Sequence, residues 1–143
     1  MDTNSSVKGS IAIKAPVSKI WDILTNPDKI VLYIGSQTHT DWTVGSPITW
    51  EGEMHGTKFQ NKGVVLENKP NRLLRFTYWS GMGGDADLPA NYSEITYRLN
   101  QLSNNSVELI YLRIKIPTAL EKQIFDGHLP SMLEEIKRLS EEK

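Results

Sequence analysis

The chain has 143 residues, 38% of them hydrophobic and 23% charged, which is enough for one domain over residues 1–143 with a buried core. Its formal net charge of -1 argues against a nucleic-acid partner, because such proteins usually present a basic face. The absence of cysteine excludes disulfides and cysteine-ligated metals and is typical of a cytoplasmic protein. No apolar run approaches the roughly 18 residues of a membrane span. The small polar residues 1–6 are expected to be disordered.

The first part of the chain predicts one strand and then two short helices. Alternating apolar residues indicate a strand over residues 7–14. Pro16 suits the first turn of a helix, and apolar residues at helical spacing extend that helix to about residue 26. Pro27 ends it, because the residue before a proline avoids the helical conformation. A second short helix or turn follows over residues 28–33.

Five later segments alternate between apolar and polar residues, as strands of a half-buried antiparallel sheet do. These segments are residues 48–53, 59–67, 72–79, 92–100 and 107–116. Turns between them are mostly short, so successive strands are predicted to be neighbours. In the last strand we expect Ile110 and Leu112 to face the core, and Tyr111 and Arg113 to face solvent.

Two intervening stretches predict loops. Residues 36–46 have little periodicity, apart from a short strand-like run at residues 41–44. Residues 80–91 are rich in glycine and acidic side chains, and a loop of that length in a compact domain is often functional or mobile.

Residues 118–143 predict one long amphipathic helix. Its apolar stripe consists of Leu120, Ile124, Leu129, Met132, Leu133, Ile136 and Leu139. The strands are the only large partner that could cover this stripe. We therefore predict an α+β fold in which a curved antiparallel sheet of about six strands wraps around the helix and encloses a pocket. Pro130 predicts a kink or restart of the helix near Asp126, which would turn Phe125 or His128 toward the pocket mouth.

Three motifs, taken in order, resemble a known family. Residues 15–25 read as a proline followed by an apolar-Trp pair and a Leu-Thr pair, and Asn26-Pro27 comes next. Residues 45–50 form a Gly-to-Trp strand, and residues 63–73 lead into a turn with Pro70 and Arg72. Together they are similar to the START-like, or SRPBCC, superfamily, in the branch of the activator of heat-shock-protein-90 ATPase homologues (C-terminal-domain-like).

This resemblance implies a helix-grip fold, whose cavity often takes apolar or amphipathic small molecules. The chain departs from the family pattern at two places that affect the cavity wall. Gly127-His128 stands where relatives carry Gly-Trp. Asn105-Ser106 and Tyr111-Leu112 stand where relatives tend to carry Gly-Thr and a histidine.

Bulky aromatic and pliable methionine side chains suit an apolar pocket with a few polar contacts. The predicted ligand-binding residues are Trp50, Met54, Phe59, Phe76, Tyr78, Met82, Tyr92, Tyr97, Ile110, Leu112, Phe125, His128 and Met132. Each of these side chains could instead simply fill the core. His128 in particular could be a partly exposed residue at a helix break.

Other chemistry has weaker support in the sequence. His39, Asp41, His55 and His128 show no metal-ligand spacing, so no metal and no cofactor are expected. Alternation places the acidic residues of the strands on the solvent side, so no catalytic residue is assigned.

Three functions therefore remain open. The first is a carrier or sensor of a small apolar or amphipathic ligand, acting as a monomer or homodimer. The second is a protein-interaction module with a chaperone partner. The third is a cyclase or hydrolase that uses the same cavity.

Overall fold

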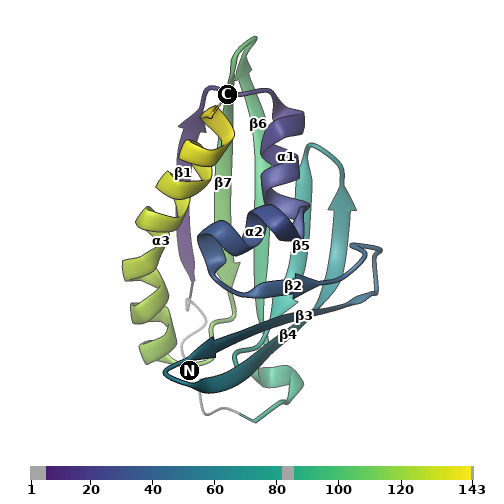
Figure 1. The fold of residues 1–143 in the computed structure, drawn as a ribbon, viewed down its shortest axis with the longest axis vertical. Coiled ribbons are helices and arrows are strands. Elements are labelled where there is room, and N and C mark those ends of the chain that lie inside the picture. The colour runs from purple at the N-terminus through teal and green to yellow at the C-terminus, as the bar shows by residue number, and fades with distance from the viewer. Residues whose placement is uncertain (1–5, 82–85, 143) are drawn as a thin grey trace.

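The computed structural model describes residues 6–81 and 86–142, and its centre is a seven-stranded antiparallel sheet (Figure 1). The strands lie in the order β1-β7-β6-β5-β4-β3-β2. Their bounds are β1 (Val7–Ile13), β2 (Gln37–His39), β3 (Pro47–Met54), β4 (Thr57–Lys69), β5 (Leu73–Tyr78), β6 (Ser93–Ser103) and β7 (Ser106–Ile114). The helices are α1 (Val17–Thr25), α2 (Pro27–Ile34) and α3 (Ala119–Glu141), with a short 3-10 turn η1 (Pro89–Asn91). The predicted α+β helix-grip class is confirmed.

The junction between α1 and α2 follows from two residues. Asn26 is extended, and its side chain accepts a hydrogen bond from the backbone N–H of Asp28, so it caps the second helix. Pro27 occupies the first turn, where its missing N–H is not needed. Gly35 ends α2 in the left-handed conformation, with a φ of 85°. The two helices cover one end of the sheet, beside α3 (Figure 1).

The seventh strand, β2, lies inside the segment that was predicted to be a loop. Gln37–His39 pair with β3, so that Thr38 lies opposite Trp50. The strand-like run at residues 41–44 is not a strand: Trp42 adopts a left-handed φ of 63°, and its indole N–H donates to the carbonyl of Thr25 at 2.7 Å. A strand of three residues is too short for alternation to reveal it.

The C-terminal half of α3 packs against β1 and α1, as the apolar stripe predicted. Its buried residues are Leu129, Met132, Leu133, Ile136, Leu139 and Ser140. Gly9 of β1 lets the helix come close, since an added Cβ there would lie 2.9 Å from a methyl group of Leu129.

The N-terminal half of α3 differs from the prediction in two ways. Leu120 and Ile124 are 66% and 65% exposed, so they do not belong to the buried stripe. The helix also continues through Pro130 without a restart near Asp126. Pro130 lies on the exposed side of the helix. It has no N–H to donate to the backbone carbonyl of Asp126, four residues earlier, and on this side water can donate to that carbonyl instead.

Gly127 gives a direct test of helix propensity in α3. It is exposed, and an added Cβ would meet nothing within 4 Å. Glycine inside a helix is less favourable than alanine by about 0.5–1 kcal/mol. We expect Gly127→Ala to raise the free energy of unfolding by that amount, measured by urea denaturation. A loss of stability would mean that alanine is strained at this position, although the structure places it inside α3.

The direction of side chains along β7 is the reverse of the prediction. Val107, Leu109, Tyr111 and Arg113 are the buried set. Ile110 and Leu112 instead lie on the outer face of the sheet, beside Arg75 and Arg98. Both alternating sets of side chains in this strand are largely apolar, so alternation alone does not show which set is buried. The charge of Arg113 favoured the wrong assignment, in which this residue faces solvent.

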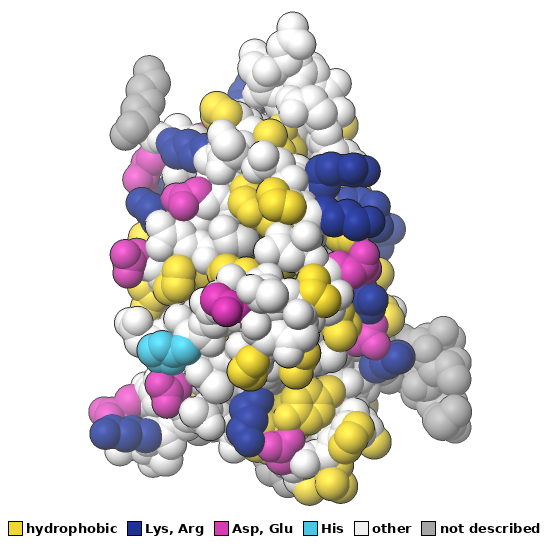
Figure 2. Space-filling view, turned by 90° about the vertical axis from the view of Figure 1, so that its right-hand side faces the viewer, with side chains coloured by type: hydrophobic (Ala, Val, Ile, Leu, Met, Phe, Trp, Pro, Cys, Tyr) yellow, Lys and Arg dark blue, Asp and Glu magenta, His cyan; other side chains and the backbone are white. Residues whose placement is uncertain are grey.

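The outer face of the sheet pairs opposite charges. Arg75 bonds Glu67 at 2.9 Å and Glu94 at 2.8 Å, and Lys115 bonds Glu94 at 2.9 Å. On the face drawn in Figure 2, Lys and Arg side chains likewise lie near Asp and Glu side chains, with hydrophobic ones between them. Such surface pairs each contribute about 0–1 kcal/mol. That view also shows several Lys and Arg side chains side by side at its upper right.

Candidate functional site

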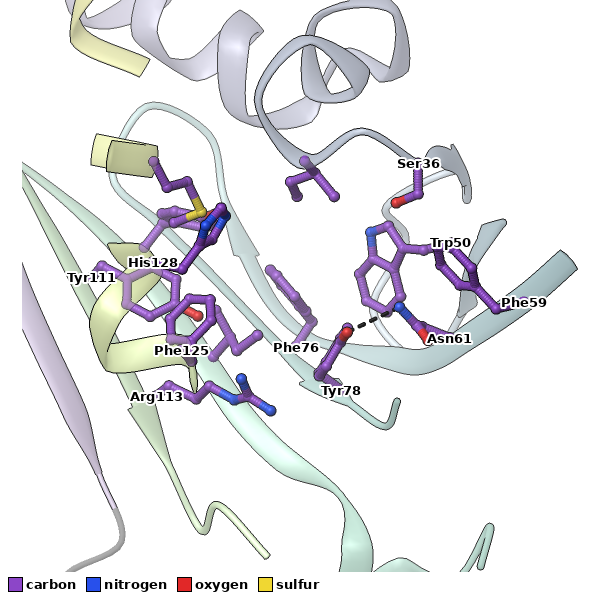
Figure 3. Close-up of a pocket in the computed structure, with 14 residues that line it drawn as sticks. Ser36, Trp50, Phe59, Asn61, Phe76, Tyr78, Tyr111, Arg113, Phe125 and His128 are labelled. Carbon is purple, nitrogen blue, oxygen red and sulfur yellow. Dashed lines mark hydrogen bonds between the residues drawn. The ribbon is translucent and has the colours of Figure 1, made fainter. Parts of the chain in front are cut away.

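A cavity of about 230 Å³ lies between the sheet and α3 (Figure 3). We call it the inner cavity. Its lining combines side chains from the sheet, the end of α2 and α3. The lining residues are Ile34, Ser36, Trp50, Phe59, Asn61, Phe76, Tyr78, Ile95, Tyr97, Tyr111, Arg113, Phe125, His128 and Met132.

A second, more open pocket of about 420 Å³ adjoins the inner cavity. We call it the outer pocket. The two spaces share five lining residues, which are Phe59, Asn61, Tyr78, Arg113 and Phe125. The exposed Met54, Leu120 and Ile124 belong to the outer pocket alone. The outer pocket is therefore placed to serve as an entrance to the inner cavity.

A chain of aromatic rings forms much of the inner wall. Ring centroids are 5.7 Å apart for Trp50–Phe76, 5.2 Å for Trp50–Tyr78, 6.2 Å for Phe76–Tyr97, 5.3 Å for Tyr97–Tyr111 and 5.3 Å for Tyr111–Phe125. Aromatic contacts at these distances stabilise one another beyond the area that they bury. The wall is thus largely aromatic and apolar, which suits an apolar ligand.

Arg113 is the charged group of this wall, and only 3% of it is exposed. Its Nε–H donates to Ser93 Oγ at 2.9 Å, and its Nη2 donates to the carboxylate of Glu121 in the first turn of α3. The guanidinium lies 4.9 Å from the ring centroid of Tyr78 and 5.0 Å from that of Phe125. A buried cation needs such partners to offset the loss of hydration.

Hydroxyl and amide groups add further polar contacts. The side-chain amide of Asn61 donates to the Tyr78 hydroxyl at 2.9 Å (Figure 3), and its oxygen accepts from the backbone N–H of Gly81. Burial raises the pKa of both Tyr97 and Tyr111. A tyrosine hydroxyl is protonated at neutral pH even at its ordinary pKa, and burial moves these two pKa values further from neutral, so both hydroxyls can donate.

Eight of the predicted ligand-binding residues line the inner cavity. They are Trp50, Phe59, Phe76, Tyr78, Tyr97, Phe125, His128 and Met132. His128 is exposed overall, with its ring 6.3 Å from that of Phe125, and it reaches the cavity from α3 (Figure 3).

The other predicted residues lie elsewhere. Met54 borders the outer pocket only. Tyr92 stacks on Trp79 with ring centroids 6.4 Å apart and donates to Asp87, away from the inner cavity. Ile110 and Leu112 are on the outer face of the sheet, as described above. Met82 lies outside the described residues.

The sequence analysis missed several lining residues, of which Tyr111, Arg113 and Asn61 matter most. Tyr111 and Arg113 were assigned to the wrong face of β7. Asn61 could have been found, because it lies two positions from Phe59 and therefore on the same face of β4.

Residues 6–81 and 86–142 contain neither a cluster of metal ligands nor a helix that could span a membrane. No three His, Asp or Glu side chains gather there as metal ligands. None of the helices in those ranges has the length and hydropathy that crossing a membrane requires.

A family model described as "Activator of Hsp90 ATPase homolog 1-like protein" matches residues 14–141. The chain belongs to this family. The match includes all residues that line the inner cavity. The resemblance to the START-like branch of heat-shock-protein-90 ATPase activator homologues is confirmed.

Solved structures of similar proteins agree with this assignment. ChR145 from Cytophaga hutchinsonii is 31% identical, with a TM-score of 0.81 over 96% of this chain and 94% of that one. The Aha1 dimer from Colwellia psychrerythraea is 18% identical, with a TM-score of 0.73 over 95% and 96%. CalU16 from Micromonospora echinospora is 17% identical, with a TM-score of 0.74 over 95% and 76%. A comparison with curated proteins found no match.

Proposed function

We propose that this protein is a cytoplasmic carrier or sensor that binds a small apolar or amphipathic ligand in the inner cavity. The observation that carries the proposal is an aromatic-walled cavity of about 230 Å³ with one buried cation, Arg113, at its edge. Binding sites for small molecules commonly combine a mostly apolar lining with a few placed polar groups. The family assignment supports the same interpretation.

The size of the cavity limits the ligand. A volume of 230 Å³ corresponds to about eight water molecules, or to a ligand of about a dozen non-hydrogen atoms at the packing density of protein interiors. A longer ligand would extend into the outer pocket past Phe125 and Tyr78.

Ligand binding can be tested by measuring the melting temperature with a library of lipids and aromatic compounds. A ligand at about 100 times its Kd stabilises the folded state by about 2.7 kcal/mol, which raises Tm by several degrees. Native mass spectrometry of protein purified from its host would identify a molecule that co-purifies. A reproducibly empty protein with no thermal shift across the library would contradict the proposal.

A substitution at His128 should locate the site. Its side chain reaches the inner cavity while the residue itself is exposed, so a larger side chain can enter the cavity without disturbing the core. We expect His128→Trp to weaken binding about tenfold or more, measured by isothermal titration calorimetry.

Gln123→Trp is the matched control for this substitution. Gln123 is also exposed on α3, but it lines neither the inner cavity nor the outer pocket. Its replacement is expected to leave the Kd unchanged. Equal effects of the two tryptophans, or no effect of His128→Trp, would place the binding site elsewhere.

The family description and the Colwellia neighbour also favour a second candidate, a chaperone cofactor that acts as a monomer or homodimer. This function predicts that the purified protein binds the chaperone in a pull-down and stimulates its ATPase rate. No binding and no stimulation would remove it. Catalysis as a cyclase or hydrolase has less support, since no carboxylate lines the inner cavity among the described residues.

A further inference from the structure

The charge of Arg113 is already balanced before any ligand binds. Glu121 bonds its Nη2 directly, and the exposed fractions of the two side chains are 3% and 19%. The pair is net neutral and lies where the inner cavity meets the outer pocket, because Arg113 lines both spaces. A ligand that reaches this junction therefore meets an ion pair rather than an unbalanced positive charge.

Arg113 has N–H groups left besides those that bond Ser93 and Glu121. The N–H bonds of a guanidinium lie in its plane, so Arg113 forms its hydrogen bonds at the edge of that plane, while the rings of Tyr78 and Phe125 lie about 5 Å from its central carbon. Ser93 takes Nε and Glu121 takes Nη2, whereas Nη1 makes no hydrogen bond with any described residue. Figure 3 shows the guanidinium reaching from beneath Phe125 toward Tyr78, at the cavity wall.

We propose that Arg113 donates from Nη1 to an uncharged oxygen of the ligand, of the ketone or ester carbonyl type, and that Glu121 excludes a carboxylate from this position. The inference rests on the proposed function and names the chemical class of its ligand. A carbonyl oxygen offers the acceptor that Nη1 does not find among the described residues, and it adds no charge.

A carboxylate at the same position would place two negative charges beside one positive charge. In a site with little water, that arrangement is costly, since like charges repel strongly when they are shielded from solvent. Glu121 therefore acts as a selectivity element directed against acids. An apolar body with a carbonyl at one end is the ligand shape that this arrangement favours.

Three probes with equal numbers of non-hydrogen atoms test the inference on the unmodified protein. They are 2-acetylnaphthalene, 2-isopropylnaphthalene and 2-naphthoate, and their Kd values are measured by isothermal titration calorimetry. We expect the ketone to bind about fivefold tighter than the hydrocarbon, because a hydrogen bond to a charged donor is gained. We expect it to bind about tenfold tighter than the carboxylate.

Glu121→Gln should reverse the discrimination against the acid. Glutamine keeps the size and an acceptor oxygen but removes the charge, which leaves Arg113 free to pair with a carboxylate. We expect the Kd of 2-naphthoate to fall about tenfold or more, while that of the ketone changes by less than about threefold. A melting curve of the variant confirms that it is folded.

Glu94→Gln is the matched control. Glu94 is 19% exposed, like Glu121, and it pairs with Arg75 and Lys115, but on the outer face of the sheet. Its substitution should leave all three Kd values unchanged.

The outcomes separate this inference from the function on which it rests. Equal binding of all three probes, or tightest binding of 2-naphthoate to the unmodified protein, would overturn the inference and leave the carrier or sensor proposal standing. An unchanged Kd of 2-naphthoate in a folded Glu121→Gln variant would also overturn it. Absence of binding by all three probes would also overturn the inference, whereas the carrier or sensor proposal falls only if the library and native mass spectrometry find no ligand.

Discussion

Replacing Ile136 by alanine is expected to lower the free energy of unfolding by about 4 kcal/mol. Ile136 is fully buried, with 0% exposure, in the half of α3 that packs against β1 and α1. The substitution removes apolar area from the core and leaves a cavity that the rigid sheet cannot close. Urea denaturation, followed by circular dichroism, measures the change.

Ile124→Ala provides an internal control, because both residues are isoleucines on the same helix. Ile124 is 65% exposed at the edge of the outer pocket, so its replacement should change stability by no more than about 0.5 kcal/mol. Alanine has a higher helix propensity than isoleucine, and this gain is similar in both variants, so the difference between them reports packing alone. Similar losses at the two positions would mean that α3 is not held by its C-terminal half.

Ile124 and Ile136 also show how much of the packing of α3 a sequence pattern can predict. Helical spacing placed Ile124 and Ile136 on one stripe, and it correctly predicted that the helix is covered by the sheet. It could not show which part of the helix the sheet covers, because periodicity describes the helix and not the length of the sheet. In the structure the fully buried part of the stripe begins at Leu129, and the exposed apolar residues before it border the outer pocket.

The strands show the same distinction between a clear pattern and an ambiguous one. In β3, Ile48 and Trp50 alternate with polar residues, and both are buried as predicted. In β7 both faces are largely apolar, so the pattern fits two registers and the wrong one was chosen. The deciding facts are contacts that only the folded chain makes, which are the hydrogen bond of Arg113 to Ser93, 20 residues earlier, and its ion pair with Glu121.

The sequence predicted the main aromatic residues of the candidate site, but it did not predict the polar residues Arg113 and Asn61. Trp50, Phe76, Tyr78 and Tyr97 were placed on inward faces by alternation, and all four line the inner cavity. Arg113 was excluded because a charged side chain usually faces water. Only the three-dimensional arrangement of Glu121, Ser93 and two aromatic rings makes its burial possible.

Trp50→Ala should destabilise the protein by about 3 kcal/mol, near the lower end of the range for buried aromatic residues. Trp50 is 3% exposed, and it packs against Phe76 and Tyr78, so its loss removes a large part of the inner wall. Trp50 also lines the inner cavity, so it makes fewer packing contacts than a side chain surrounded by protein on all sides, and this lowers the cost. Denaturation by urea at constant pH measures the difference in the free energy of unfolding.

A comparison with Trp79→Ala separates the role of Trp50 in the core from a general effect of removing tryptophan. Trp79 is half-buried and stacks on Tyr92, away from the inner cavity, so we expect a loss of about 1 kcal/mol. The folded Trp50→Ala protein should also accept bulkier ligands, because its cavity is larger than that of the parent. If the loss at Trp50 were as small as the loss at Trp79, the ring would serve mainly as a pocket lining. A loss of 5 kcal/mol or more would instead mean that the ring is packed on all sides and that the inner cavity is too small for a ligand.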